Sequence, residues 1–291
     1  MGVRRPWVAG AFYPASPDRL RGAIEDSFTH PLGPGKLPQK GSEEREIIGV
    51  VCPHAGYMYS GPVAAHSYYH LASEKPPSAV IILGPNHTGL GGPVSMWGEG
   101  AWETPLGNVE IHEPLAKKIF EASDIIDMDE SAHLREHSIE VQLPFLQYIY
   151  GETRIVPICM GFQDLGTSRA IGRAIAESVA GMDALILAST DLTHMETKDS
   201  AGEKDRGVIE RIESMNEEAL QSWVRSQRVS MCGYGPVSAT LVAAKRLGAT
   251  KAQLLAYGTS GDIPSDMSAV VGHASAKITR QKVRAAEATA P

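Results

Sequence analysis

The sequence contains few cysteines, and this shortage excludes several classes of protein. Its 291 residues include only Cys52, Cys159 and Cys232, and no C-x-x-C pair joins any two of them. Zinc ribbons and thioredoxin-like redox motifs need such pairs and are therefore excluded. An odd, sparse set of cysteines is typical of free thiols in a reducing compartment, so we expect a cytoplasmic protein.

Long apolar runs and a strong charge imbalance are also missing. No stretch approaches the roughly 20 apolar residues of a membrane helix, and the first residues lack the apolar core of a signal peptide. Charged residues make up 21% of the chain, and the formal net charge is −7. A mildly acidic chain is poorly suited to wrap nucleic acid or to coat an anionic membrane. We therefore expect neither among the partners.

Apolar residues, at 43%, are abundant enough for a large buried core. Continuous apolar runs, typical of strands covered on both faces, occur at residues 46–51, 79–84, 154–160, 183–189, 253–258 and 268–278. Helical patterns lie between them at residues 18–28, 114–122, 136–150, 168–180, 205–227 and 236–247. This alternation predicts an α/β fold: a single-domain sandwich whose central sheet, mainly parallel or mixed, is flanked by helices.

No linker divides the chain, so we predict one domain over residues 1–279. Residues 280–291 have no core pattern. They therefore form a predicted C-terminal tail that frays.

Three of the predicted strands are followed at once by a histidine. The first leads into His54, the second into His87, and the fourth into Asp191 and His194. Ligands of open α/β sheets bind beyond the carboxyl ends of the strands, which is where these histidines fall. A single loop histidine more often bonds only to the backbone. Three together, one of them near an aspartate, favour a functional site.

These side chains suggest a metal with a proton-handling partner. Neutral imidazole is a common metal ligand, and two histidines from separate strands can fix two corners of a site. A further histidine can serve as general base, with Asp191 orienting it or tuning its pKa. Cys232, which precedes an expected helix, is the predicted third ligand, and we expect the helix N-terminus and a metal to lower the pKa of its thiol. Cys52 and Cys159 lie in apolar runs and are predicted to be buried.

A competing motif occurs at residues 133–137, which read H-x-x-E-H. This is the pattern of inverzincin metalloproteases, in which both histidines face one side of a helix and bind zinc. Only three positions are fixed, and the predicted helix begins near the motif rather than containing it. A zinc peptidase is therefore the weaker hypothesis, although His137 and Glu140 could still line the pocket at the strand ends.

Several motifs, in order along the chain, closely resemble the Memo family. They are VRRPWVAGAFYPASPDRL, PHAGYMYSGPVAA, ILGPNHTG, EHSIEVQLPFLQ, STDLTH and CGYGP. The match extends to about residue 278. The resemblance implies a fold similar to that of LigB-type, class III extradiol dioxygenases, which use non-haem iron(II) bound by two histidines and a glutamate.

The resemblance also implies roles for individual residues. His54 and His87 match the two metal histidines, and His194 matches the acid–base histidine, with Asp191 as its neighbour. Cys232 matches the cysteine that Memo proteins have in place of the dioxygenase glutamate. Because thiolate attracts copper and zinc as well as iron, we expect iron(II) or copper as the cofactor, with zinc as a further candidate.

Two functions of different classes follow from the resemblance. The first is a metal-dependent oxidoreductase with a His-His-Cys site. The second is a metal carrier or peptide-binding module that uses the same pocket without catalysis, since animal Memo proteins are linked with phosphopeptide binding. Microbial members are similar to protein B of the AmmeMemoRadiSam system, which implies a radical-SAM partner. The presence of His194 and Asp191 favours the enzyme, because a carrier does not need them.

Overall fold

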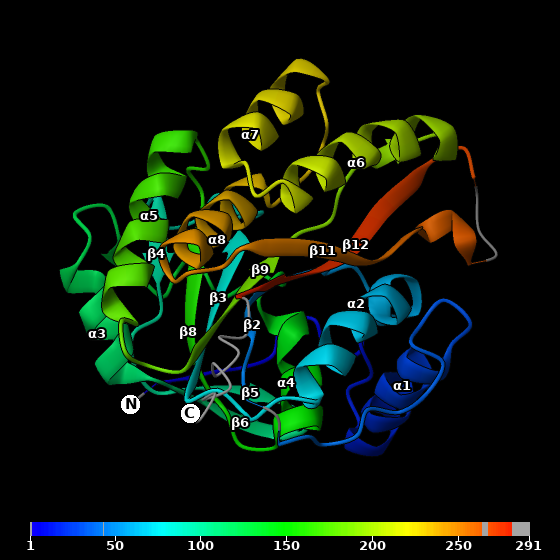
Figure 1. Cartoon of the computed structure of the whole chain (residues 1–291). Helices are drawn as coiled ribbons and strands as arrows, with labels where there is room; N and C mark the ends of the chain where they lie inside the picture. The colour runs from blue at the N-terminus through cyan, green and yellow to red at the C-terminus, as the bar shows by residue number, and fades with distance from the viewer. Residues whose placement is uncertain (1, 43, 264–266, 281–291) are drawn as a thin grey trace, which may run out of the picture.

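A mixed β-sheet forms the centre of the molecule, and helices cover both of its faces (Figure 1). The structure is a computed structural model that describes residues 2–42, 44–263 and 267–280. The strands are β1 Val3–Arg4, β2 Ile47–Cys52, β3 Ala79–Pro85, β4 Val94–Met96, β5 Ala101–Thr104, β6 Gly107–Ile111, β7 Asp127–Met128, β8 Arg154–Met160, β9 Ala184–Ser189, β10 His194–Glu196, β11 Lys251–Thr259 and β12 Val270–Thr279. The predicted α/β sandwich is confirmed.

The middle of the sheet is parallel. Strands β6, β8, β3, β9 and β2 are successive neighbours with the same direction. On the far side of β2, strand β12 runs antiparallel and pairs in turn with antiparallel β11. Every residue of β2, β3 and β9 is buried, which explains their continuous apolar sequences. The carboxyl ends of these strands therefore lie at one edge of the sheet.

The helices form a layer on each face of the sheet (Figure 1). They are α1 Pro17–Thr29, α2 Tyr57–Ala72, α3 Glu113–Glu121, α4 Leu143–Tyr150, α5 Leu165–Ser178, α6 Lys198–Glu213, α7 Glu217–Ser226 and α8 Tyr234–Arg246. Helices α5 and α8 pack together on one face, and α1, α2 and α4 contact one another on the other. A second buried apolar cluster, which includes Val208, Leu220 and Leu241, joins α6, α7 and α8 to the sheet.

All six predicted strands are present, as β2, β3, β8, β9, β11 and β12. The predicted helix over 205–227 is two helices, α6 and α7. The predicted helix over 136–150 begins only at Leu143, after a 3-10 turn at Glu140–Gln142. The Glu136 carboxylate accepts hydrogen bonds from the amides of His137 and Ser138, which holds this stretch in a turn instead of a helix. Residues 281–291, most of the predicted tail, lie outside the described residues.

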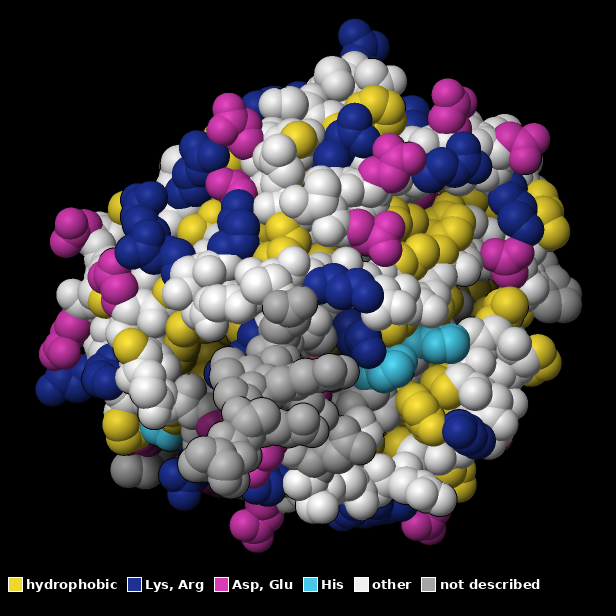
Figure 2. All heavy atoms as spheres, in the orientation of Figure 1, with side chains coloured by type: hydrophobic (Ala, Val, Ile, Leu, Met, Phe, Trp, Pro, Cys, Tyr) yellow, Lys and Arg dark blue, Asp and Glu magenta, His cyan; other side chains and the backbone are white. Residues whose placement is uncertain are grey.

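Helix α2 was not predicted, because Gly61 and Pro62 interrupt its pattern. None of the helices in the described part of the chain has the length and hydrophobicity needed to span a bilayer. On the face shown in Figure 2, basic and acidic side chains are interspersed over the upper half of the molecule. That face therefore carries no extended field of one sign.

Candidate metal centre

Three adjacent strands deliver polar side chains to the same edge of the sheet. His54, His87 and Asp191 each lie two residues beyond the last residue of β2, β3 and β9, respectively. These strands lie side by side in the order β3–β9–β2. Cys232 lies two residues before helix α8, and its amide donates to the Asp191 carbonyl at 3.3 Å. The fold thus places residues far apart in sequence at one point.

His54, His87 and Cys232 offer ligand atoms that all lie within 4.8 Å of one another. The Nε2 atom of His54 is 3.2 Å from the Cys232 sulfur. The rings of His54 and His87 are nearly perpendicular, with centroids 5.3 Å apart. Metal–ligand bonds of about 2.0–2.3 Å place tetrahedral ligands about 3.5 Å apart. The three side chains therefore fit one ion with only small movements.

His54 and His87 are each held in place by a hydrogen bond at Nδ1. His54 Nδ1 lies 2.8 Å from the Ser189 hydroxyl, and His87 Nδ1 lies 2.9 Å from Oε1 of Glu136. A hydrogen bond of this kind fixes the ring orientation and the tautomer of a metal-binding histidine. The Nε2 atoms are left for a ligand, which is the donor arrangement that a metal requires.

The pKa of His54 suits a metal ligand, but the pKa of Cys232 differs from the prediction. Burial lowers the pKa of His54 to about 3, so its imidazole is neutral and ready to act as a ligand. Burial, followed by the negative charge of Asp191, raises the pKa of the Cys232 thiol well above its usual range. The prediction that the helix N-terminus lowers the pKa of the Cys232 thiol is wrong for the protein without metal, because desolvation raises this pKa by more. A bound cation would supply the charge that stabilises the thiolate.

The Asp191 carboxylate supports the backbone of a ligand loop. Its Oδ1 accepts from the His54 amide at 3.0 Å and lies 3.1 Å from Nδ1 of His273. Burial alone would raise the pKa of Asp191, but the two neighbouring histidines hold it below its usual range. Between these described residues, no hydrogen bond joins Asp191 to His194. The expected orientation of His194 by Asp191 is therefore corrected: the carboxylate serves His54 and His273.

His194 is instead oriented by backbone groups. Its Nδ1 lies 2.8 Å from the Leu192 carbonyl and 2.9 Å from the Ser230 carbonyl. Carbonyls only accept hydrogen bonds, so Nδ1 carries the proton and Nε2 is the basic nitrogen. The side chain is half-buried and lies outside the three-residue ligand set. This geometry leaves His194 able to take up a proton at one defined atom.

Glu136, His137 and His273 complete the surroundings of the set. The sequence suggested that His137 could line the pocket, but outside the zinc-peptidase motif it gave Glu136 no role, and it gave His273 none. The His137 ring stacks on His87 at 4.7 Å and is 5.3 Å from His54. Burial would raise the pKa of Glu136, but its hydrogen bond with His87 and the nearby imidazoles lower it to about 2. The adjacent Glu136 and His137 of the H-x-x-E-H motif were the sequence feature that could have marked these two residues. His273 lies inside strand β12, where nothing in the pattern marks it.

The H-x-x-E-H motif does not have the geometry of a zinc peptidase. Residues 133–135 lie in a turn and residues 136–137 in the irregular stretch after it, so the motif does not lie on one helical face. His133 is fully buried, bonds to the Ser95 carbonyl and packs against Trp102. Glu140 is also fully buried and pairs with Arg4, so it does not line the candidate site. Of the motif, only Glu136 and His137 reach the histidine cluster.

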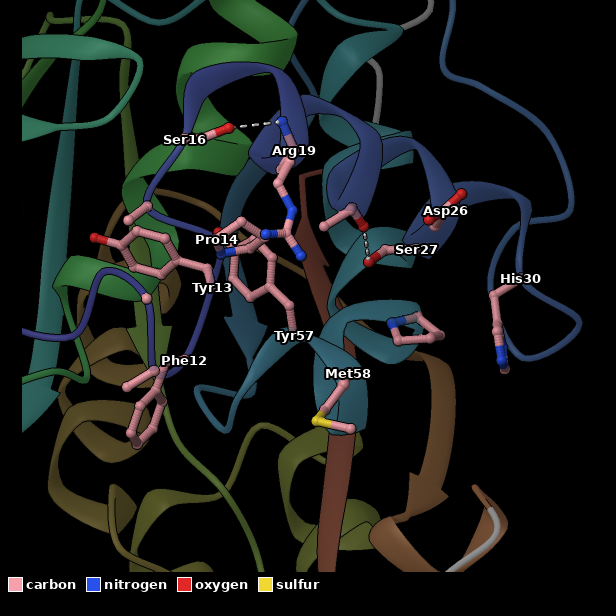
Figure 3. A pocket seen from close by; sticks show the side chains of 15 residues that line it. Phe12, Tyr13, Pro14, Ser16, Arg19, Asp26, Ser27, His30, Tyr57 and Met58 are labelled. Atoms are coloured by element: carbon pink, nitrogen blue, oxygen red, sulfur yellow. Dashed lines mark hydrogen bonds between the residues drawn. The ribbon is translucent and has the colours of Figure 1, made fainter.

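A cavity of about 620 Å³ is lined by residues 10–16 and by side chains of α1 and α2. Figure 3 shows its lining, with Tyr13 and Tyr57 close together, Met58 below them and Arg19 reaching down toward them from α1. Phe12 lines this cavity and also contacts His137, with ring centroids 4.7 Å apart. The cavity is within the size range of small-molecule sites, and Phe12 links its lining to the histidine cluster.

The fold and the site define an α/β protein with a candidate His-His-Cys metal centre at the carboxyl edge of its sheet. The chain belongs to the Memo-like protein family, whose model matches residues 4–277.

Similar proteins occur in archaea. The chain is 52% identical over 274 residues to the MEMO1 family protein MK0963 of Methanopyrus kandleri, with coverage of 93% of this chain and 97% of that protein. It is also 52% identical over 274 residues to MTH_45 of Methanothermobacter thermautotrophicus, covering 94% and 99%. A solved structure of the uncharacterized protein JW3007 from Escherichia coli K12 is similar in fold, with a TM-score of 0.55 and 11% identity over 80% of this chain and 100% of that chain.

Proposed function

We propose that His54, His87 and Cys232 bind one transition-metal ion and that the protein is a metal-dependent oxidoreductase. The observation that carries this proposal is the convergence of three ligand atoms within 4.8 Å, with Nδ1 of both histidines already engaged. Thiolate with two imidazoles suits iron(II) and copper, and zinc is the third candidate. Held by these three side chains, iron or copper would supply electron transfer, whereas zinc would act only as a Lewis acid.

In this proposal, the chain's own residues orient the ligands and handle protons. Ser189 and Glu136 fix the two imidazoles, and Asp191 fixes the backbone of the His54 loop. His194 takes up or releases a proton at Nε2, because its Nδ1 proton is committed to two carbonyls. The cavity that Phe12 links to His137 accommodates the organic substrate. Location in the cytoplasm and a radical-SAM partner are further proposals, which rest on the sparse cysteines and on the family resemblance.

One observation favours a non-catalytic metal carrier as the second candidate. Asp191 contacts His54 and His273 and not His194, so the aspartate that suggested catalysis also has a purely supporting role. A carrier needs the ligands and their supports but has no use for His194. The role of His194 therefore separates the two functions.

The test compares oxygen consumption by wild type and His194→Ala at matched iron or copper content, with catechols or small reductants as substrates. Loss of a general acid–base group lowers a rate by roughly a hundredfold or more. His70→Ala, in the last turn of α2 and outside the cavity lining, is the control for a general effect of removing an imidazole. An unchanged rate in His194→Ala, or no metal-dependent turnover by wild type, would favour the carrier.

A further inference from the structure

We propose that the segment of residues 4–13 is a positioning element of the metal centre, acting through Arg4 and the buried Glu140. This inference rests on the proposed metal site but concerns residues outside it. The segment contacts the loop that follows His54 and the 133–140 turn, whose Glu136 carboxylate binds His87.

Arg4 holds the loop that orients His87. Its side chain is fully buried, with Nε donating to the His133 carbonyl at 2.7 Å and Nη2 donating to the Glu136 carbonyl at 2.7 Å. The guanidinium also lies over the Trp102 ring, 4.2 Å from its centroid. Five donors in a rigid fork allow one arginine to fix two carbonyls and a carboxylate together, which lysine cannot do. The backbone of Glu136 is thus fixed at the residue whose carboxylate binds His87.

Glu140 fixes the 4–13 segment in return. One carboxylate oxygen accepts from Arg4 Nη1 and from the Trp7 amide, each at 2.8 Å. The other accepts from the Val8 amide at 2.9 Å and from the Tyr13 hydroxyl at 2.7 Å. A buried carboxylate with four donors is fully satisfied, so displacement of the segment would leave a buried charge without partners.

The same segment reaches the His54 loop. The Phe12 carbonyl accepts from the Tyr57 amide at 2.8 Å, and this satisfies a free donor in the first turn of α2, three residues after His54. The Phe12 ring packs on His137 at 4.7 Å, and Phe12 and Tyr13 line the cavity seen in Figure 3. Both ligand histidines are therefore held through one segment.

The test measures affinity and spectrum of metal binding by folded protein. Arg4→Lys keeps the charge opposite Glu140 but loses the fork to the two carbonyls. Cobalt(II) is the probe, since its d–d and thiolate charge-transfer bands report the ligand geometry, and affinity is obtained by competition with a chromophoric chelator. We expect about a tenfold loss of affinity and shifted bands, as for partners of metal ligands in general. Circular dichroism and the melting temperature of the metal-free protein report folding separately.

Arg5→Lys is the matched control, because the neighbouring Arg5 is largely exposed and pairs with Glu103 on the surface. Tyr13→Phe removes one hydrogen bond to Glu140 without removing charge, and it serves if Arg4→Lys does not fold. Wild-type affinity and bands in folded Arg4→Lys and in Tyr13→Phe would overturn this inference alone. Failure of the wild type to bind cobalt(II) would overturn the proposed metal site and this inference with it.

Discussion

At the scale of single residues, Glu136 fixes the orientation of the candidate ligand His87. Its carboxylate accepts four hydrogen bonds: from the amide and the ring of His87, and from the amides of His137 and Ser138. Only an ionised carboxylate accepts at both oxygens from that many donors. One side chain therefore fixes both the ring of His87 and the turn on which His137 lies.

Glu136→Gln should weaken metal binding by about 10–100-fold while preserving the size of the side chain. The amide has one acceptor oxygen, so its NH₂ group must face N–H donors, and His87 loses its fixed orientation. Isothermal titration with cobalt(II) or iron(II) under nitrogen measures the effect. His87→Ala, which removes a ligand, should cost more than Glu136→Gln.

Glu130→Gln is the control for this change, since Glu130 is exposed and lies, like Glu136, between β7 and α4. Equal affinities of Glu136→Gln and wild type would show that the contact with His87 has no influence on the metal. The account of how the ligands are oriented would then be wrong at this residue.

At the scale of elements, the strand ends and the 136–139 turn must lie close together. Gly84 near the end of β3 has no space for a side chain: a Cβ there would be 2.5 Å from the Ser138 hydroxyl and 2.8 Å from Ile139. This approach brings Glu136 to His87, which follows β3 by two residues. A strand glycine here is required by contact with another segment.

Gly84→Ala should therefore destabilise the protein by roughly 1–3 kcal/mol, since the turn must move away from the strand. It should also weaken metal binding, because the same movement stretches the His87–Glu136 bond. Gly22→Ala in α1 is the matched control: nothing lies within 4 Å of the new methyl group, and alanine favours a helix by about 1 kcal/mol. Chemical denaturation of both variants, without and with metal, tests this prediction; a Gly84→Ala protein as stable as wild type would contradict the close packing.

The helices, strands and turns also explain which parts of the fold and of the site could be predicted from the sequence. Buried parallel strands have continuous apolar sequences, so β2, β3 and β9 were predictable, and with them the edge at which His54, His87 and Asp191 lie. Glu136 comes from a turn that the pattern suggested as helix, because hydrogen bonds within the turn override helical spacing. Neither the link between Asp191 and His273 nor the absence of one to His194 is visible in sequence, since both depend on the strand pairing of β12.

At the scale of the whole molecule, the candidate centre is a meeting point of distant segments. His54 and Cys232 lie 178 positions apart in sequence, yet their ligand atoms are 3.2 Å apart. The parallel strands β2 and β3 place two ligands at one edge of the sheet, and the loop before α8 places the third there. The 4–13 segment contacts the 133–136 turn and the start of α2. An ion bound at this point would stabilise the folded state, because the unfolded chain does not assemble the three ligands.

The central claim is that one ion is bound by two imidazoles and one thiolate. X-ray absorption at the metal edge tests it most directly, on anaerobically prepared protein loaded with one equivalent of iron(II) or copper. The account predicts one sulfur at about 2.3 Å and two nitrogens at about 2.0–2.1 Å, with the sulfur lost in Cys232→Ser and kept in Cys159→Ala. A first shell of nitrogen and oxygen alone in the wild type, or a sulfur signal that survives Cys232→Ser, would contradict it.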